Sequence, residues 1–468
     1  MDGQGGWHGS FGEEHFGAAE LGDARRTKRL VRIADKMVKH PDGTLPDKIN
    51  DPAELRALYR LANEARVTHE AVLEPSRART LRKMAETEQT VLVIHDTTEL
   101  DFSGLSISTL GHIGNGFGRG YLVHNTLAVV AETRDVLGLA YQKLAKRPKR
   151  DKKKKPESRA ETRARPDRES RLWTEASRTI PIAPPGCRWV EVGDRGADVL
   201  EYLDFAEANG KSYVVRSKHN RCISLENGEK TKLHDRARTF AARATKPLDV
   251  PAAKQRPARK AKVAIAWEKM TLRVPRQPRG EIRGVPLVVW VVRVWEPDPP
   301  AGVEPLEWIL LTNVAVNDLA DAWERVAWYE CRWIIEEYHK ALKTGCDIEE
   351  MQFTTEGGLQ PMIALQSVVA LFLLNLRNAS RSPDARERPA SEVVPLLFVM
   401  VLALHRYKEP RENLTVHEFY YALARLGGHQ NRKSDHPPGW LVLWRGWMKL
   451  QPMIEVASAL GLNKCGKT

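Results

Sequence analysis

The segment WYECRWIIEEYHKALKTG, residues 328–345, restricts the fold of this 468-residue chain more than any other. Its aromatic and charged residues recur at steps of three or four, so a helix would carry them on one face. These residues are Tyr329, Arg332, Glu336, Lys340 and Lys343. Alternating charge is also typical of a solvated, salt-bridged helix surface, so the face indicates a site only if other acidic residues join it.

Two aspartates follow short apolar runs that predict buried strands. Val91–Ile94 comes just before Asp96, and Trp189–Val192 comes just before Asp194. We expect each aspartate at the carboxyl end of its strand, aimed into a cleft. A helix is expected after the second strand, with Asp198 in its first turn, where a negative charge complements the helix dipole. A lone aspartate in such a place also serves as a turn former or a helix cap.

Three carboxylates in a basic chain form a more specific pattern than any one of them. Asp96, Asp194 and Glu336 would supply hard oxygen ligands, which favour Mg²⁺ or Mn²⁺ over zinc. Two such ions about 4 Å apart would activate a water or a 3′-hydroxyl and stabilise the departing oxygen of a phosphodiester. The pattern therefore predicts metal-dependent phosphoryl transfer.

Several separate motifs resemble those of the DDE transposases of bacterial insertion sequences, in the insertion-sequence-four family typified by the Tn-five transposase. DTT at Asp96–Thr98 and GDR-AD at Gly193–Asp198 are similar to the two aspartate blocks of that family. The helix face described above matches its Y-(2)-R-(3)-E-(6)-K signature without a change of spacing. The resemblance extends over most of the chain.

The resemblance implies roles for particular residues. It makes Asp96, Asp194 and Glu336 the catalytic and metal-binding triad, holding two Mg²⁺ ions or Mn²⁺ in their place. It places Trp308 against a nucleotide flipped out near the transposon end, where stacking contributes about 1–3 kcal/mol. Core packing beside Ile309 is the alternative role of Trp308. The other residues implied to contact DNA near the site are Tyr329, Arg332, Lys343, Arg216 and Lys218, and Lys340 on the same helix face is expected there too.

The amino-terminal segment, residues 1–75, lacks strand patterning and is predicted to be a helical domain that binds transposon ends. LGDARRTKRL crowds basic residues into about one helical turn, and AELRALYRL adds an aromatic residue and another arginine. A solvated helix face would show the same cluster. The residues expected at DNA here are Arg25, Arg26, Arg29, Tyr59 and Arg60. With 73 Lys and Arg against 60 Asp and Glu, the net charge of +13 favours a polyanionic partner such as double-stranded DNA.

The catalytic core is expected over residues 76–357 as an RNase H-like α/β fold. A basic loop at residues 146–171, almost free of large apolar side chains, interrupts it and is predicted to order against DNA. Strand-like pieces broken by Pro and Gly predict a β-rich insertion at about 220–306. The insertion contains RPARKA, which matches a motif of the family, although a generic basic loop would look alike. The residues expected at DNA there are Arg256, Arg259 and Lys260.

Residues 358–468 are predicted to form a helical domain through which two protomers pair. Trp440, Trp444 and Trp447 recur at helical spacing near its end, a stripe more typical of a core than of a ligand platform. The resemblance implies a homodimer in a synaptic complex that holds two DNA ends.

Other classes of protein are disfavoured. The five cysteines show no CxxC pair, which argues against a zinc site or a disulfide framework and indicates a reduced, intracellular protein. GHIGNGFGRG lacks the spacing and the following helix of a nucleotide-binding loop. We expect no secretory signal and no membrane contact, because the apolar stretches around Val393–Leu404 and Val368–Leu374 are too short to span a bilayer and suit buried helices.

The resemblance implies a cytoplasmic, nucleoid-associated bacterial enzyme that performs cut-and-paste transposition. Water would nick the transposon end, the freed 3′-hydroxyl would form a hairpin with the opposite strand, and the reopened ends would be inserted into target DNA. No serine or tyrosine nucleophile is needed. A metal-dependent DNA nuclease, a catalytically inactive transposase-derived DNA-binding protein and a structural protein with a charged helix surface remain as alternatives.

Overall fold

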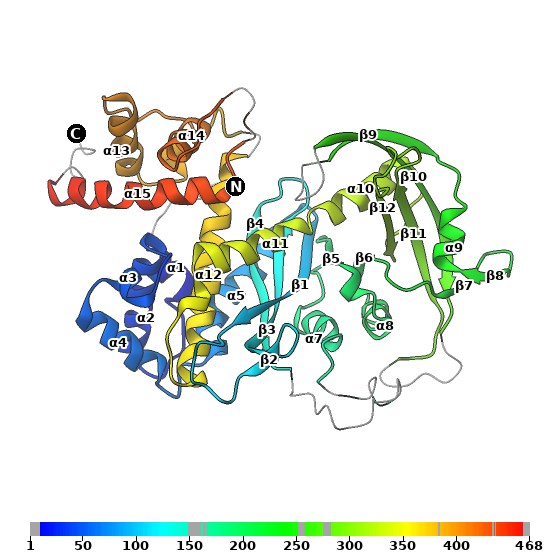
Figure 1. The fold of residues 1–468 in the computed structure, drawn as a ribbon, viewed down its shortest axis with the longest axis horizontal. Coiled ribbons are helices and arrows are strands. Elements are labelled where there is room, and N and C mark those ends of the chain that lie inside the picture. The colour runs from blue at the N-terminus through cyan, green and yellow to red at the C-terminus, as the bar shows by residue number, and fades with distance from the viewer. Residues whose placement is uncertain are drawn as a thin grey trace.

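A mixed sheet with helical regions before and after it makes up the computed structural model (Figure 1). The structure describes residues 10–147, 161, 165, 167–250, 258–274, 282–381, 384–432, 435 and 437–461. The predicted α/β class, with an RNase H-like core, a β-rich insertion and flanking helical regions, is confirmed. The basic loop predicted at 146–171 lies mostly outside the described residues.

The amino-terminal region is helical, as predicted. Its helices are α1 (Phe11–Phe16), α2 (Ala24–Lys39), α3 (Leu45–Ile49), α4 (Pro52–Ala62) and α5 (His69–Glu86). The side chains of Asp23 and Asp51 accept hydrogen bonds from the first backbone N–H groups of α2 and α4, which fixes where these helices begin. Helix α5 contains Pro75 and continues through it, so the domain boundary expected at residue 75 falls inside a helix.

The core of the sheet has the strand order β4-β3-β1-β5-β6. The strands are β1 (Val91–Asp101), β2 (Gly111–Ile113), β3 (Gly118–Val130), β4 (Val136–Ala145), β5 (Trp189–Gly193) and β6 (Ser212–Arg216). Strand β3 pairs antiparallel with β1, β2 and β4, whereas β1, β5 and β6 run parallel. The connecting helices are α7 (Arg171–Thr179), the 3₁₀ helix η1 (Arg195–Ala197) and α8 (Leu200–Ala208).

Strand β1 continues past Asp96, contrary to the prediction that this residue ends a strand. His95 is the last residue of β1 paired with β5, opposite Gly193, whereas the pairing with β3 runs on to Asp101. β-branched residues suit extended backbone, and Thr97 and its neighbour Thr98 carry the strand forward. Asp96 therefore lies immediately beyond the end of the parallel ladder, inside a longer antiparallel one.

The insertion extends the same sheet. Its strands are β7 (Cys222–Ser224), β8 (Lys230–Lys232), β9 (Ala244–Val250), β10 (Arg259–Leu272), β11 (Leu287–Trp295) and β12 (Glu307–Thr312), with helix α9 (Leu233–Arg238) between β8 and β9. β12 pairs antiparallel with β6, with Leu310 opposite Arg216. Strand β10 runs without a break from Arg259 to Leu272, because the polar Glu268 and Lys269 stay in the ladder with β11.

The carboxy-terminal part of the chain is helical. Its elements are α10 (Leu319–Glu330), α11 (Trp333–Lys340), the π-helix η2 (Ala341–Gly345), the 3₁₀ helices η3 (Ile348–Glu350) and η4 (Ala390–Glu392), α12 (Glu356–Ser380), α13 (Leu396–Tyr407), α14 (Val416–Leu426) and α15 (Trp440–Ala459). Helices α10 and α11 lie across the sheet and lead to α12 (Figure 1). Trp440, Trp444 and Trp447 of α15 are buried, which confirms that the tryptophan stripe belongs to a core.

Helix α12 is the central helix of the molecule. Over Glu356–Asn375 it is long and apolar enough to cross a membrane, but 83% of the apolar window is buried inside the protein. It stands between the amino-terminal helices and the sheet, with α15 at one end (Figure 1). The apolar stretch at Val368–Leu374 therefore belongs to a buried core helix, as expected, although that helix is longer than the stretch alone indicated.

Candidate active site

The two aspartates lie on neighbouring parallel strands. The pairing of His95 with Gly193 puts the next residues, Asp96 and Asp194, side by side at the end of the β1–β5 ladder. Asp194 caps η1, and its Oδ1 accepts from the N–H of Gly196 across 2.7 Å. A Cβ on Gly196 would approach a ring carbon of Trp173 to 2.8 Å, so this turn needs a glycine. The GDR-AD motif therefore shapes the turn that presents Asp194.

Arg332 connects the helix glutamate to the first aspartate. Its Nη2 donates to Oε1 of Glu336 across 2.6 Å, and its Nη1 lies 3.5 Å from Oδ2 of Asp96. The Arg332 side chain is only 9% exposed, so little water screens these contacts. Three residues of the predicted site thus come from β1 and from the start of α11, and the guanidinium lies between the two carboxylates.

Asp96 is electrostatically strained by its neighbours. Burial and, after it, repulsion from Asp194 raise the pKa of Asp96 to about 6, while the Thr97 N–H and Arg332 act in the opposite direction. A carboxyl group pushed this way is more favourable when protonated or when a cation is close. Its environment indicates that the acidic residues lie near enough to interact.

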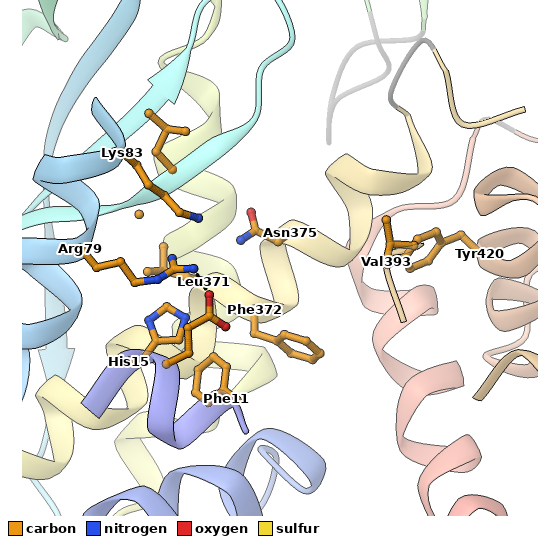
Figure 2. A pocket seen from close by; sticks show the side chains of 12 residues that line it. Phe11, His15, Arg79, Lys83, Leu371, Phe372, Asn375, Val393 and Tyr420 are labelled. Atoms are coloured by element: carbon orange, nitrogen blue, oxygen red, sulfur yellow. Dashed lines mark ion pairs between the residues drawn. The ribbon is translucent and has the colours of Figure 1, made fainter. Parts of the chain in front are cut away.

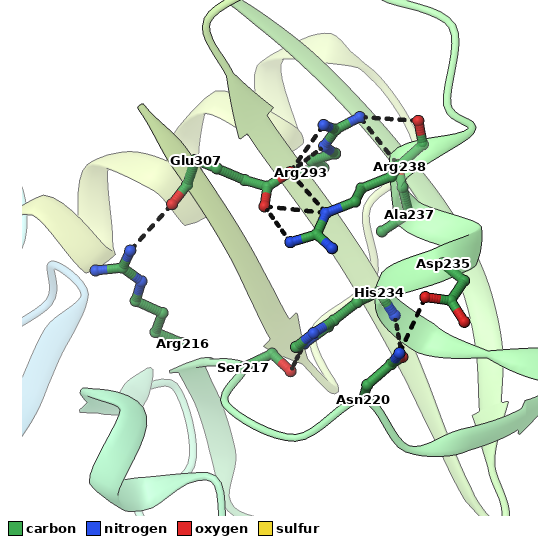
Figure 3. A network of polar contacts seen from close by, with 9 residues as sticks. All are labelled: Arg216, Ser217, Asn220, His234, Asp235, Ala237, Arg238, Arg293 and Glu307. Carbon is green, nitrogen blue, oxygen red and sulfur yellow. Dashed lines mark hydrogen bonds and ion pairs between the residues drawn. The ribbon is translucent and has the colours of Figure 1, made fainter. Parts of the chain in front are cut away.

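Tyr329 and Arg216 extend the site toward the insertion. Tyr329 is buried in α10 and hydrogen-bonds Arg216, and burial raises the pKa of its hydroxyl. Arg216 ends β6 and donates to the backbone carbonyl of Glu307 across 3.0 Å (Figure 3). The Glu307 carboxylate is held by Arg293 and Arg238, each at 2.8 Å, as Figure 3 shows. The first residue of β12 is thus fixed from both sides.

Trp308 follows Glu307 on β12 and is half-buried against the main core. Its neighbour Glu307 presents the carbonyl that Arg216 binds, and Arg216 in turn contacts Tyr329. Trp308 packs against the core as a partly buried residue, in line with the alternative role of core packing.

The predicted helical face is divided among three elements. The chain turns at Cys331 and Arg332 between α10 and α11, and α11 passes into the π-helix η2 at Ala341. Lys340 is exposed at the end of α11. Lys343 lies on the π-helix, and its Nζ is 3.4 Å from Glu349 Oε1. The prediction that one continuous helix carries all five residues was therefore wrong. Short π-helical turns such as η2 are frequent at functional sites.

The basic residues of the amino-terminal helices differ in exposure and in whether a carboxylate pairs with them. Arg25 is exposed and pairs with Asp23, whereas Arg26 pairs with Glu64 across 2.7 Å. Tyr59 stacks edge-on against Phe353, with ring centroids 5.3 Å apart. Arg29 is half-buried in α2, and Arg60 is exposed on α4.

The residues expected at DNA in the insertion also differ. Arg256 lies outside the described residues. Arg259 makes a bidentate ion pair with Glu296, whose side chain is 2% exposed, so its guanidinium serves the fold. Lys260, the next residue on the strand, is exposed. Lys218 is exposed beyond the end of β6, where its backbone N–H donates to Asp198 across 2.6 Å.

Asp198 has a role that the sequence did not predict. It is buried at the end of η1 instead of lying in the first turn of α8, and its carboxylate pairs with Arg221 at 2.6 Å. It also accepts from the N–H groups of Lys218 and His219. Asp198 therefore fixes the loop after β6 through internal bonds. The only signal in the sequence was its place in the GDR-AD motif.

A buried polar chain beside the carboxylates was also missed. Asn125 lies opposite Asp96 in the β1–β3 ladder, and its amide contacts His339 Nε2 at 3.1 Å. Burial lowers the pKa of His339 to about 3, so the ring is neutral and accepts this hydrogen bond. Gln142 donates to Asn125 across 2.8 Å and to Ser367 of α12 across 2.8 Å. The chain joins the helix of Glu336 to β3, the strand that pairs with the strand of Asp96.

Trp333 is a further residue that was missed. Its side chain is 60% exposed, and Arg332 lies over its ring, 4.8 Å from the centroid. A large apolar ring left in water beside a buried arginine is a candidate surface for a nucleic-acid base. The one feature of the sequence that could have indicated Trp333 is its position directly after Arg332 of the signature.

The cavity drawn in Figure 2 is separate from these residues. It has a volume of about 210 Å³ and lies between α1, α5, the end of α12 and the carboxy-terminal helical part. Its charged lining includes Lys83 and the Glu14–Arg79 ion pair. None of the triad residues lines it.

Two family models match the chain. One described as Transposase DNA-binding matches residues 8–67, and one described as Transposase DDE domain matches residues 190–373. The chain carries the two domains of a DDE transposase. The second match contains Asp194 and Glu336 and begins after Asp96, which lies beside Asp194 at the end of the β1–β5 ladder. DDE transposase domains generally depend on divalent metal ions, and DNA is their partner.

The carboxylates of the DDE transposase suit a divalent cation by their chemistry. Asp96, Asp194 and Glu336 offer oxygen ligands, and the repulsion that raises the pKa of Asp96 is what a cation would relieve. Within the described ranges, no three His, Cys, Asp or Glu side chains are grouped closely enough to hold one ion. Arg332 instead contacts both Asp96 and Glu336.

Proposed function

We propose that this DDE transposase belongs to the insertion-sequence-four family and performs cut-and-paste transposition through a DNA hairpin. The observation that carries the proposal is the shared ion pairing of Asp96 and Glu336 by Arg332, directly beside Asp194. The proposed organisation is an end-binding domain over residues 1–75, a catalytic core over 76–357 and a dimerisation domain over 358–468.

The triad residues would hold two Mg²⁺ ions, with Mn²⁺ as a substitute. When bound, these ions supply an activated oxygen nucleophile and stabilise the departing oxygen of the phosphodiester. Glu336 has to exchange its contact with Arg332 for this, and the DNA phosphate offers the guanidinium a new bidentate partner. Arg332 would then pass from the carboxylates to the substrate when DNA arrives.

The residues around the triad would hold the distorted transposon end. Tyr329 and Arg216 form one hydrogen-bonded pair toward the insertion, and Trp308 and Trp333 each keep part of a ring exposed. An unpaired base needs such a surface during hairpin formation. Lys340, Lys343 and Lys218 would neutralise backbone phosphates. A plain nuclease has no need of this set, which is why we favour transposition over that alternative.

The partner contacts belong to the same proposal. Arg25, Arg29, Arg60 and Lys260 present charge that is exposed or half-exposed, and the net charge of +13 favours association with a bacterial nucleoid. Apolar side chains exposed at one end of α15 and on α13 support pairing of two protomers through the carboxy-terminal domain. They are Val456, Leu460 and Leu404.

A cleavage assay tests the proposal. Purified protein is incubated with Mg²⁺ and duplexes that carry the ends of its own element, and nicks, hairpins and strand-transfer products are resolved on a denaturing gel. We expect all three products from the wild type and none from Asp96→Asn or Glu336→Gln. Nicks without hairpins, with pre-cut ends that fail to join target DNA, would identify a nuclease instead.

A further inference from the structure

Lys48 is an unusual residue of the amino-terminal domain because its side chain is fully buried. It lies on α3, inside the segment that matches the transposase DNA-binding model, and is 2% exposed. Lysines are rarely buried to this degree unless an acidic group pairs with them. Its placement therefore calls for a reason other than solubility.

The ammonium group of Lys48 is held by neutral acceptors. Its Nζ donates to the backbone carbonyl of Cys346 across 2.6 Å. With the Gln366 amide oriented to donate to the same carbonyl at 3.0 Å, the amide oxygen accepts from Nζ at 3.3 Å. In the part of the chain that the structure describes, no carboxylate lies within ion-pair distance of Nζ. Burying a charge beside neutral acceptors lowers the stability of the fold, so stabilisation of the fold does not explain this contact.

The carbonyl bound by Lys48 ends the π-helix of the catalytic region. Cys346 follows η2, and its N–H donates back to Ala341 across 2.8 Å, which closes the π-turn. Lys343 lies inside this turn and pairs with Glu349. Glu349 also accepts from the N–H of Asp101 across 2.7 Å, at the end of the strand that carries Asp96. The π-turn is thus attached to β1 on one side and to Lys48 on the other.

The end of the π-turn also has little room to move. A Cβ on Gly345 would lie 2.8 Å from Leu373 of α12 and 3.1 Å from Trp440 of α15. Gly345 therefore allows the turn to pack directly on two other helices. Lys48 adds the contact from the amino-terminal domain at the residue that follows.

We propose that Lys48 is a positioning residue that couples the DNA-binding domain to the catalytic helix. By holding the Cys346 carbonyl it fixes the π-turn and so sets where Lys343 presents its charge to the DNA backbone. This inference rests on the proposed function, because it assigns Lys343 to the DNA that is cut. When the amino-terminal domain binds a transposon end, a shift of α3 would move the π-turn through the hydrogen bond between Lys48 and the Cys346 carbonyl.

Lys48→Met tests the proposal because it keeps an unbranched side chain of nearly the same length and removes both the charge and the hydrogen-bond donor. We expect the thermal midpoint to be unchanged or raised, and the affinity for an end duplex to stay within about twofold of wild type. The nicking rate at saturating DNA and Mg²⁺ should fall at least about tenfold. Lys39→Met, an exposed lysine of α2, is the matched control and should leave the rate unchanged.

A double variant shows whether Lys48 acts through Lys343. Lys343→Met should slow nicking on its own, and Lys48→Met combined with it should slow nicking no further. Losses that multiply would overturn the coupling. A normal rate in Lys48→Met, or a loss of end binding in that variant, would also overturn it.

A second variant covers the case in which Lys48→Met does not fold. Gln366→Met removes the amide that shares the Cys346 carbonyl and leaves Lys48 in place, so a smaller fall in rate, about two- to fivefold, is expected with unchanged end binding. A wild-type rate in this variant would contradict the inference. If wild-type protein itself makes no nicks at its own ends, the proposed function fails, whereas nicking by wild type and equally by both variants rejects the role of Lys48 alone.

Discussion

Arg332 donates to Glu336 across 2.6 Å at the start of α11, one helical turn away. The same guanidinium lies 3.5 Å from Asp96, so one buried cation compensates two carboxylates that would otherwise repel each other. The arginine of the signature therefore has a function in the free protein as well as any contact with DNA.

Replacing this arginine should destabilise the fold in a way that depends on its carboxylate partners. Arg332→Met leaves Asp96 and Glu336 uncompensated, and we expect a loss of about 3 kcal/mol of unfolding free energy at pH 7.5. Urea unfolding measures it. Asp96→Asn should raise the stability of Arg332→Met by more than it raises the stability of the wild type, and equal gains in the two backgrounds would show that the ion pair between Arg332 and Asp96 contributes little.

Asp96 should lower the stability of the free protein at neutral pH. Its pKa in the folded state is about 6 against the ordinary value of 3.8, so the folded protein binds the proton more tightly than the unfolded chain. Stability is therefore lost as the pH rises between these two values and is constant above them. We expect Asp96→Asn to be more stable than wild type by about 1–3 kcal/mol at pH 7.5.

The difference between Asp96→Asn and wild type should largely vanish near pH 4, where Asp96 is mostly protonated. Urea unfolding in the presence of a chelator at the two pH values provides the comparison. If Asp96→Asn is less stable than wild type at pH 7.5, the protein stabilises the ionised Asp96 carboxylate, contrary to this prediction.

Neighbouring residues of β10 should have opposite phenotypes. Arg259→Met leaves the buried Glu296 without its bidentate partner and should lower the free energy of unfolding, measured by urea unfolding. Lys260→Met should leave stability within about 0.5 kcal/mol and reduce the slope of log affinity against log salt by about 0.9. Equal salt slopes for Lys260→Met and wild type would remove Lys260 from the DNA-binding surface.

The polar chain through Asn125 should be important for stability. Asn125→Leu leaves His339 and Gln142 with unpaired buried groups, and we expect a loss of about 2–4 kcal/mol, measured by urea unfolding. Asn209→Leu, which removes an exposed hydrogen bond to Phe205, is the matched control and should change stability by less than about 0.5 kcal/mol. A similar small change in Asn125→Leu would argue against the chain.

Sequence patterns predicted the parts of the fold that depend on local periodicity. The strands at Trp189–Gly193 and Leu287–Trp295 agree with apolar runs, because a buried strand is apolar throughout or alternates strictly. The tryptophan stripe of α15 was likewise assigned to a core. The helical signature of 328–345 was assigned to one face, and the structure brings Arg332 to the carboxylates.

The parts that could not be predicted depend on contacts between distant segments. The turn at Cys331 and the π-turn at 341–345 break an even helical spacing for reasons of packing, such as the close approach of Gly345 to Trp440. The pairing of Arg259 with Glu296 is set by strand register across the insertion. No local pattern separates an arginine that holds a buried glutamate from one that faces DNA.

The hydrogen-bonded ladder between β6 and β12 joins the strands of the insertion and the catalytic strands in one continuous sheet. Tilting one part against the other would break ladder bonds, each with a net cost of about 1 kcal/mol. A duplex that reached both Lys260 and Asp96 would have to conform to a stiff protein. The energy of that assembly would then depend on how easily the nucleic acid itself deforms, which favours ends with flexible pyrimidine–purine steps.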